Sequence, residues 1–114
     1  MSCVDADVRV GDTGTEIDFR VLDQDGVAVD VSTATLTMYF VKPDGTTLGP
    51  KTAQPGSVLA AATRLATAGW CYYITVAGDI DMRGSWIVEV VYVLGGKQLT
   101  STPDTFFVES PRHG

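Results

Sequence analysis

The sequence predicts an all-β protein, an antiparallel sandwich of about seven short strands built as one domain. Apolar and polar residues alternate with a period of two along most of the chain, which is typical of strands that bury one face. Turn-forming residues, chiefly Gly, Pro and Asp, separate these stretches at short intervals. No long segment with helical periodicity lies between them, so a parallel sheet with crossover helices is not expected.

The first half of the chain contains three predicted strands. Residues 5–10, 16–21 and 35–40 each carry apolar side chains at every second position. A strand sends successive side chains to opposite faces, so one face of each segment is expected to be buried. Residues 42–45 follow with the sequence Lys-Pro-Asp-Gly. Because proline presets φ and glycine accepts a positive φ, the chain is expected to reverse there.

Further strands are predicted over residues 70–76 and 86–92. Gly95-Gly96 then supplies a two-residue hairpin turn, and the chain is expected to return over residues 97–109. Pro103 cannot donate a hydrogen bond to a strand ladder, so it fits only an edge or a bulge. The large aromatic residues that the alternation places toward the core are Trp70, Tyr72 and Trp86.

Residues 57–66 fit two interpretations. Ser57 is a candidate helix N-cap, the residues after it are good helix formers, and Gly69 is a stop signal. An isolated helix of this length is marginal, however, and the neighbouring segments are strands. The sequence therefore leaves strand and helix open and favours an extended strand.

Composition and charge limit the number of domains, the classes of partner and the cellular compartment that can be expected. Residues 1–110 are predicted to form the single domain and residues 111–114 a flexible tail. A net charge of −6 and eight scattered Lys and Arg residues argue against a nucleic acid partner. The apolar runs are far shorter than the roughly 20 residues of a membrane-spanning helix, so no membrane is expected. The first residues lack the features of a signal peptide, which favours synthesis and assembly in a cytoplasm.

Neither a cofactor nor a metal site is expected. Cys3 and Cys71 lack Cys-x-x-Cys spacing and a companion histidine, and cytosolic thiols stay reduced, so zinc, redox chemistry and a disulfide are all disfavoured. Residues 23–26, Asp-Gln-Asp-Gly, match half of a calcium loop. Val21 and Ser32 stand where further ligands would be needed, so a plain turn is favoured.

Two acidic motifs are candidates for catalysis, and neither is favoured. Residues 12–14 are Asp-Thr-Gly, the aspartic protease motif, whose chemistry needs two such aspartates sharing one proton at a dimer axis. Gly11 precedes the motif where such proteases place apolar residues, so a turn is the favoured interpretation. Asp79 and Asp81 are interpreted as ordinary turn residues. The single histidine, His113, lies in the tail, and the chain is predicted not to be an enzyme.

One outward-facing strip is predicted to be apolar. Ile87, Val91 and Val93 share the outer face of a strand, and monomeric proteins rarely leave such a strip in water. Tyr73 and Phe107 are also placed on outer faces, where an aromatic ring serves as a protein contact or as a platform for a sugar. The predicted protein interface consists of Ile87, Val91, Val93, Tyr73 and Phe107.

The order of the motifs between residues 8 and 108 resembles that of a known family. The segments concerned are turns and alternating strands: Gly11-Asp12-Thr13-Gly14, Ile17-Asp18-Phe19-Arg20-Val21, Asp25-Gly26-Val27-Ala28-Val29-Asp30-Val31, Ala34-Thr35-Leu36-Thr37-Met38-Tyr39-Phe40-Val41-Lys42-Pro43-Asp44-Gly45, Gly69-Trp70, Tyr72-Tyr73, Gly78-Asp79-Ile80, Gly84-Ser85-Trp86 and Phe106-Phe107-Val108. In this order they resemble the N-terminal domain of phage baseplate upper proteins.

The resemblance implies an immunoglobulin-like sandwich of a phage virion, where such domains attach tail fibre or receptor-binding components to the baseplate. Members of that family usually continue into a fibre-joining region, whereas this chain stops soon after Val108. The roles of a free-standing adaptor, a decoration protein or a neck protein therefore stay open beside the carrier role.

The expected function is that of a non-enzymatic structural or adaptor protein of a tailed-phage virion, in the baseplate, tail or neck. Its expected partners are other virion subunits, joined in symmetric multiple copies after assembly in the host cytoplasm. Two alternatives stay open. One is a carbohydrate-binding sandwich module that uses Tyr39 and Tyr73, and the other is a retroviral-type aspartic protease.

Overall fold

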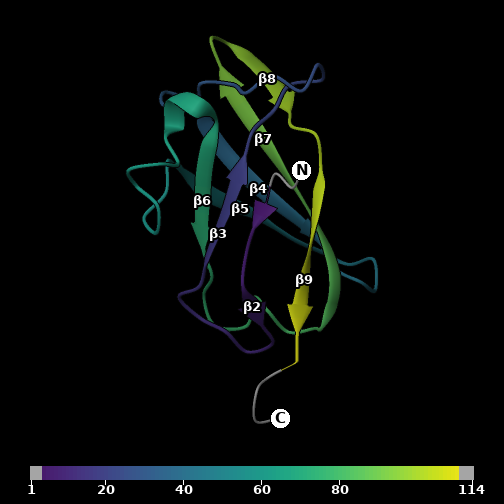
Figure 1. The fold of residues 1–114 in the computed structure, drawn as a ribbon. Helices are drawn as coiled ribbons and strands as arrows, with labels where there is room; N and C mark the ends of the chain where they lie inside the picture. The colour runs from purple at the N-terminus through teal and green to yellow at the C-terminus, as the bar shows by residue number, and fades with distance from the viewer. Residues whose placement is uncertain (1–3, 111–114) are drawn as a thin grey trace.

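The computed structural model describes residues 4–110, which form an all-β sandwich without an α-helix, so the predicted fold class is confirmed. Figure 1 shows the strands in space, with the colour following the chain from purple at the N-terminus to yellow at the C-terminus. They are β1 (Val4–Asp5), β2 (Val8–Arg9), β3 (Glu16–Arg20), β4 (Thr35–Val41), β5 (Thr47–Pro55), β6 (Trp70–Ile74), β7 (Gly84–Leu94), β8 (Lys97–Thr100) and β9 (Asp104–Glu109). One short 3-10 helix, η1 (Ala66–Ala68), precedes β6.

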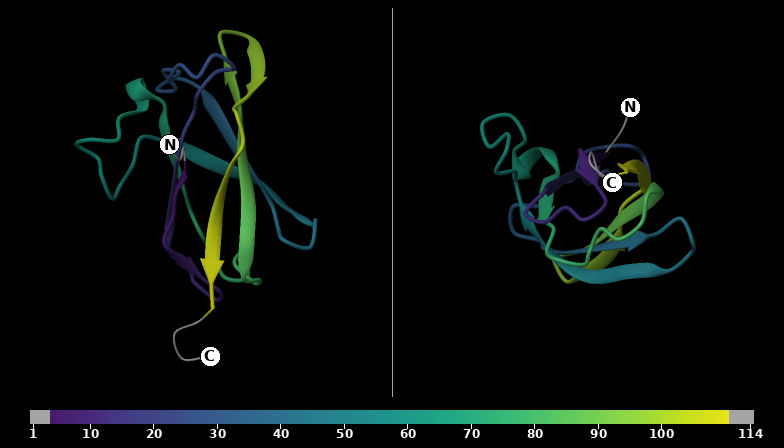
Figure 2. Two further views of the ribbon diagram at one scale, coloured as in Figure 1. Left: turned by 45° about the vertical axis from the view of Figure 1, so that its right-hand side comes forward. Right: turned by 90° about the horizontal axis from the view of Figure 1, so that it is seen from below.

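The strands pack as two layers that curl toward each other (Figure 2). One layer is β1-β3-β6, and the other is β5-β4-β7-β9-β2, with β8 pairing the last part of β7. β5 joins the layers, since most of it pairs with β4 while Gln54 and Pro55 at its end pair with β6. This partition, with β3 and β6 opposite β4, β7 and β9, is that of an immunoglobulin-like sandwich.

The N-terminal strand is divided between the two layers. β1 pairs antiparallel with β3, whereas β2 pairs parallel with β9. The single strand predicted over residues 5–10 is therefore two strands, and the prediction of a purely antiparallel fold is wrong for the β2–β9 pair. By changing layers, one short segment covers the exposed edges of both β3 and β9, which would otherwise leave unpaired backbone groups.

The C-terminal return strand is also interrupted. Its two parts, β8 and β9, are separated by residues 101–103. Pro103, predicted to lie at an edge or a bulge, lies instead in this break, where no ladder hydrogen bond is needed from it. Gly95 and Gly96 form the predicted two-residue turn, with φ values of 59° and 80°. The two interruptions each add a segment, and β5, which the sequence did not predict, takes the place of the strand favoured for residues 57–66, so nine segments stand where about seven strands were predicted.

Residues 57–66 form neither the favoured strand nor an α-helix: residues 57–65 are a series of turns, and Ala66 begins η1. A strand has no place here, because β6 already pairs with β3 on one side and β5 on the other. Ser57 does accept the Ala60 N–H at 3.0 Å, as a helix N-cap would. The segment lacks an apolar stripe that packs on the sandwich, so the turn does not extend into a helix.

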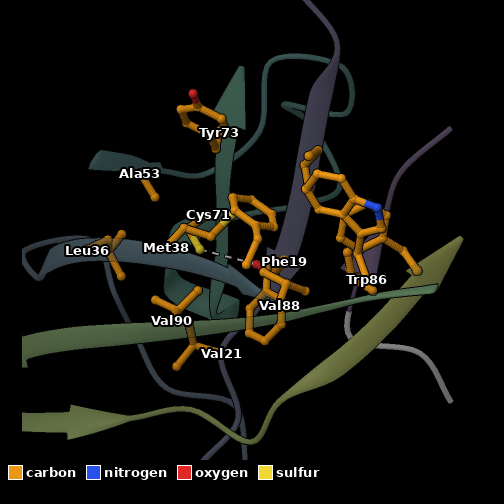
Figure 3. Close-up of a cluster of buried hydrophobic side chains, with 14 of the residues drawn as sticks. Phe19, Val21, Leu36, Met38, Ala53, Cys71, Tyr73, Trp86, Val88 and Val90 are labelled. Carbon is orange, nitrogen blue, oxygen red and sulfur yellow. Dashed lines mark hydrogen bonds between the residues drawn. The ribbon is translucent and has the colours of Figure 1, made fainter. Parts of the chain in front are cut away.

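The core is filled from both layers by side chains at alternate positions (Figure 3). Trp86 of β7 is fully buried and packs edge-on against Phe40, with ring centroids 6.3 Å apart. Its indole N–H donates to the Met82 carbonyl at 2.9 Å, so the polar atom of this large side chain is satisfied. The predicted core position of Trp86 is confirmed.

β6 presents the opposite face to the core from the one predicted. Cys71 and Tyr73 are buried, whereas Trp70 and Tyr72 are half-buried and Ile74 is exposed. Figure 3 shows Cys71 and Tyr73 within the cluster of core side chains. The inward positions predicted for Trp70 and Tyr72 and the outward position predicted for Tyr73 are therefore wrong. Both faces of this strand carry large apolar residues, so alternation alone does not identify the inner one.

Candidate functional site

Four of the five predicted interface residues share the outer face of one layer. Ile87, Val91 and Val93 point outward from β7, and Phe107 points outward from β9. The exposed fraction is 42% for Ile87, 39% for Val93 and 51% for Phe107, while Val91 is half-buried. The register of β7 with β9 makes Ile87 and Phe107 diagonal neighbours. These side chains therefore lie on one continuous sheet surface.

β4 extends this surface. Val41 lies opposite Ile87, and Tyr39 lies opposite Glu89, the one charged residue of β7 on this face. Both Tyr39 and Val41 are half-buried. The surface is called the outer apolar face below, and it consists of Tyr39, Val41, Ile87, Val91, Val93 and Phe107.

Tyr73, the fifth predicted interface residue, lies in the core and not on the surface. Its hydroxyl donates to the Asp79 carboxylate, whose other oxygen lies 3.1 Å from Lys51 Nζ. Burial and the neighbouring Asp79 carboxylate raise the pKa of Tyr73, so the hydroxyl remains a donor. No local motif predicts this network, because β5, β6 and the turn after β6 each supply one group.

A buried carboxyl pair, Glu16 and Asp18, lies on the side of β3 away from the core, beneath the loop of residues 57–65. The Ser57 hydroxyl lies 2.9 Å from Glu16 Oε2 and 2.8 Å from Asp18 Oδ2. The Arg64 guanidinium donates to Asp18 at 2.6 Å and also pairs with Asp5. Sequence alternation identifies Glu16 and Asp18 only as the polar face of a strand, since their partners lie far along the chain.

The two carboxyl groups titrate differently. Burial and the hydrogen bond with Glu16 raise the pKa of Asp18 to about 6, against the lowering effects of Arg64 and Ser57. Burial also opposes ionisation of Glu16, but hydrogen bonds with Asp18, the Leu59 N–H and Ser57 lower its pKa overall. Among residues 4–110, Asp18 Oδ1 has no hydrogen-bond partner. The pair therefore retains one proton, on Asp18, to a higher pH than an isolated aspartate would.

The acidic residues of two predicted turns are used by the turns themselves. At residues 11–14, Asp12 Oδ2 accepts hydrogen bonds from the Arg9 N–H at 2.9 Å and the Thr15 hydroxyl at 3.3 Å. Asp23 Oδ1 accepts hydrogen bonds from backbone N–H groups two and four residues further on. Both turn interpretations are confirmed, and both carboxylates act as turn acceptors.

Asp79 and Asp81 have separate partners. Asp79 is buried and bound by Tyr73 and Lys51, whereas Asp81 is exposed and pairs with Lys42. Within the stretch that the structure describes, no three His, Cys, Asp or Glu side chains lie close enough together to hold a metal ion.

Cys71 is a buried thiol. Its Sγ lies 3.5 Å from the Phe19 carbonyl oxygen, and burial raises the pKa of Cys71 to about 12. A thiol in this state is a poor nucleophile, because the thiolate is the reactive form. Cys3, His113 and the predicted tail at residues 111–114 lie outside the described residues.

An open hollow of about 250 Å³ lies between the turn at residues 23–25 and β8. Its lining consists of Asp23, Gln24, Asp25, Tyr92, Leu99 and Thr100. Burial and the Asp23 carboxylate raise the pKa of Tyr92. The acidic lining suits neither an apolar nor an anionic ligand.

Comparisons with protein-family models, with curated proteins and with solved structures found no match. Between residues 4 and 110, no helix is long and apolar enough to cross a membrane. The outer apolar face and the loop above the carboxyl pair are the two features from which a function can be inferred.

Proposed function

We propose that this chain is a non-enzymatic structural or adaptor protein of a tailed-phage virion, in the baseplate, tail or neck. It joins other virion subunits and is present in symmetric multiple copies. The observation that carries the proposal is the outer apolar face. The resemblance of its motif order to phage baseplate upper proteins supports the choice of particle.

An exposed apolar sheet face favours association with another protein. Ile87, Val93 and Phe107 keep between 39% and 51% of their surface in water. Removing apolar surface from water contributes about 25 cal/mol per Å², and monomers seldom leave continuous apolar patches exposed. The regular surface of β4, β7 and β9 can receive a flat partner such as a sheet of a neighbouring subunit.

Free strand edges offer a second way of joining subunits. In the described stretch, β8 pairs only with β7, so one edge of β8 has no strand partner. Such an edge can accept a strand from another chain by main-chain hydrogen bonding. Edge pairing and face packing together fit a protein that contacts more than one neighbour.

The two alternative functions have less support. A carbohydrate-binding module was based on Tyr39 and Tyr73, and Tyr73 is buried against Asp79. An aspartic protease would use Asp12, whose carboxylate accepts hydrogen bonds within its own turn. We therefore favour the adaptor role over both.

Particle proteomics with two matched variants tests the proposal. Ile87 and Ile74 are both 42% exposed, but Ile87 lies on the outer apolar face and Ile74 on the opposite layer. In particles made from the genome that encodes this chain, we expect several copies of the wild-type chain. Ile87→Asn should lower incorporation about tenfold, because it places an unpaired amide where a neighbour packs.

Ile74→Asn is the control and should be incorporated as the wild type is. Circular dichroism and thermal unfolding verify that both variants are folded. Absence of the wild-type chain from the particles, or equal incorporation of the two variants, would contradict the proposal.

A further inference from the structure

We propose that the tip of the loop after β5 inserts into an apolar pocket of a different virion protein. The loop tip is defined as Val58, Leu59, Ala61 and Ala62. The inference rests on the proposed function and adds a second contact surface to it, on the layer opposite the outer apolar face. Figure 2 shows this loop projecting away from the two layers.

The loop tip carries the most exposed large apolar side chains of the described residues. Leu59 is 75% exposed and Val58 is 61% exposed, and Ala61 and Ala62 are exposed beside them. The segment from Thr52 to Thr63 contains no charged residue, although the chain as a whole carries a net charge of −6. A contiguous uncharged apolar tip on an acidic protein is typical of a contact surface.

The backbone of the loop tip is held in place from below. Glu16 Oε2 accepts the N–H groups of Val58 at 3.1 Å and Leu59 at 3.2 Å, and the Ser57 hydroxyl at 2.9 Å. One buried carboxylate therefore fixes the two residues that present the most exposed apolar side chains. Because less conformational freedom remains to be lost, binding through such a tip costs less entropy.

The other end of the loop is anchored as well. The Arg64 guanidinium pairs with both Asp18 and Asp5, and it lies 4.8 Å from the centroid of the Trp70 ring. These contacts attach the loop to β1, β3 and β6. The exposed tip is thus a rigid protrusion from the sandwich.

Holding the loop in this way is costly for the fold. Glu16 and Asp18 are both buried, and Asp18 Oδ1 has no hydrogen-bond partner among residues 4–110. Burying carboxyl groups with an unsatisfied oxygen opposes folding. Natural proteins depart from a favourable arrangement mainly at functional sites, which supports a binding role for the loop tip.

The shape and charge of the tip select the kind of partner. A stable interface between two flat surfaces buries about 800 Å² on each side, far more than four small or medium side chains supply, so two tips cannot form a dimer by themselves. A protruding tip instead fits a pocket, where a few buried side chains dominate the binding energy. The acidic hollow beside β8 is unsuited to it, and the net charge of −6 opposes anionic membranes.

The expected partner of the loop tip is therefore another protein with an apolar pocket. A basic rim around that pocket would complement the acidic chain. Leu59→p-benzoylphenylalanine in particles made from the encoding genome identifies it. After irradiation, we expect one cross-linked species in which position 59 is joined to an apolar side chain of another particle protein.

Two matched variants test whether the contact matters. Val58 and Val27 are the same residue type with nearly equal exposure, 61% and 59%, but Val27 lies in the loop between β3 and β4. We expect Val58→Asn to lower incorporation into particles about tenfold and Val27→Asn to change it less than about twofold. Sedimentation velocity and flotation with phosphatidylglycerol-containing vesicles should show the same behaviour for both variants.

Several results would overturn the inference. Equal incorporation of Val58→Asn and Val27→Asn would do so while leaving the proposed function intact. A dimer or a vesicle-bound form of the wild type that Val58→Asn abolishes would assign the tip to a second copy or to lipid. Absence of the wild-type chain from the particles would overturn the proposed function and this extension together.

Discussion

Asp18 is a side chain whose surroundings conflict with its charge. One of its oxygens is bound by Arg64 and Ser57, while Oδ1 has no partner within residues 4–110, and the residue is buried. An ionised carboxylate with an unsatisfied oxygen in a buried site is unfavourable, and the nearby Glu16 adds a like charge. Protonation of Asp18 relieves both, which is why its pKa is raised to about 6.

This arrangement predicts a pH-dependent stability. The pKa of Asp18 rises from 3.8 to about 6 on folding, so its contribution to stability is complete below the unfolded pKa and is lost as the pH rises through 6. Between pH 5 and pH 7.5, we expect the free energy of unfolding of the wild type to fall by about 1 kcal/mol on this account, since about one unit of the raised pKa lies above pH 5. The lowered pKa of Glu16 has the opposite effect: it reduces the free energy of unfolding as the pH falls, and it does so at a more acidic pH than the titration of Asp18.

Urea unfolding of wild type and Asp18→Asn at pH 5 and pH 7.5 measures the effect. We expect the variant to lose most of the difference between the two pH values, whatever its absolute stability. The same pH difference in both proteins would show that Asp18 does not titrate in this range.

Among the secondary-structure elements, β6 shows most clearly what decides an inner face. Trp70, Tyr72 and Ile74 form the more apolar set by composition, yet Cys71 and Tyr73 face the core. Tyr73 gains the Asp79 acceptor there, and Trp70 on the other side packs against the Arg64 guanidinium. Tertiary partners thus outweigh the hydrophobicity of either face.

The adjacent tyrosines provide a matched test of that orientation. We expect Tyr73→Ala to lower the free energy of unfolding by about 3–5 kcal/mol, because it leaves a cavity and removes the donor to Asp79. Tyr72→Ala should cost about 1 kcal/mol or less, since its side chain is only half-buried. Chemical unfolding of both variants measures the difference, and equal costs would contradict the observed orientation of β6.

At the scale of the whole molecule, the sequence predicted those parts of the fold whose strands have one polar and one apolar face. The strands over residues 16–20, 35–41 and 84–94 were found by alternation, and the turns by their Gly, Pro and Asp residues. Alternation was insufficient for β6, where both faces are apolar. It also could not show that one N-terminal segment serves both layers, because that depends on which edges remain open after the other strands pair.

The candidate surfaces, too, could be predicted only where the alternation of apolar and polar residues along a strand identifies them. Ile87, Val91, Val93 and Phe107 were found because they interrupt the expected polar face of their strands. The carboxyl pair beneath the loop was not found, because its partners come from a segment without regular structure. Local patterns identify faces of elements, whereas contacts between distant segments require the folded chain.

The most direct measurement is a side-chain-resolution cryo-EM reconstruction of particles made from the encoding genome. We expect every copy of the chain to have the outer apolar face, including Ile87 and Phe107, within about 4 Å of a neighbouring subunit. A reconstruction that lacks the chain, or in which this face is turned to water in every copy, would contradict the proposed role.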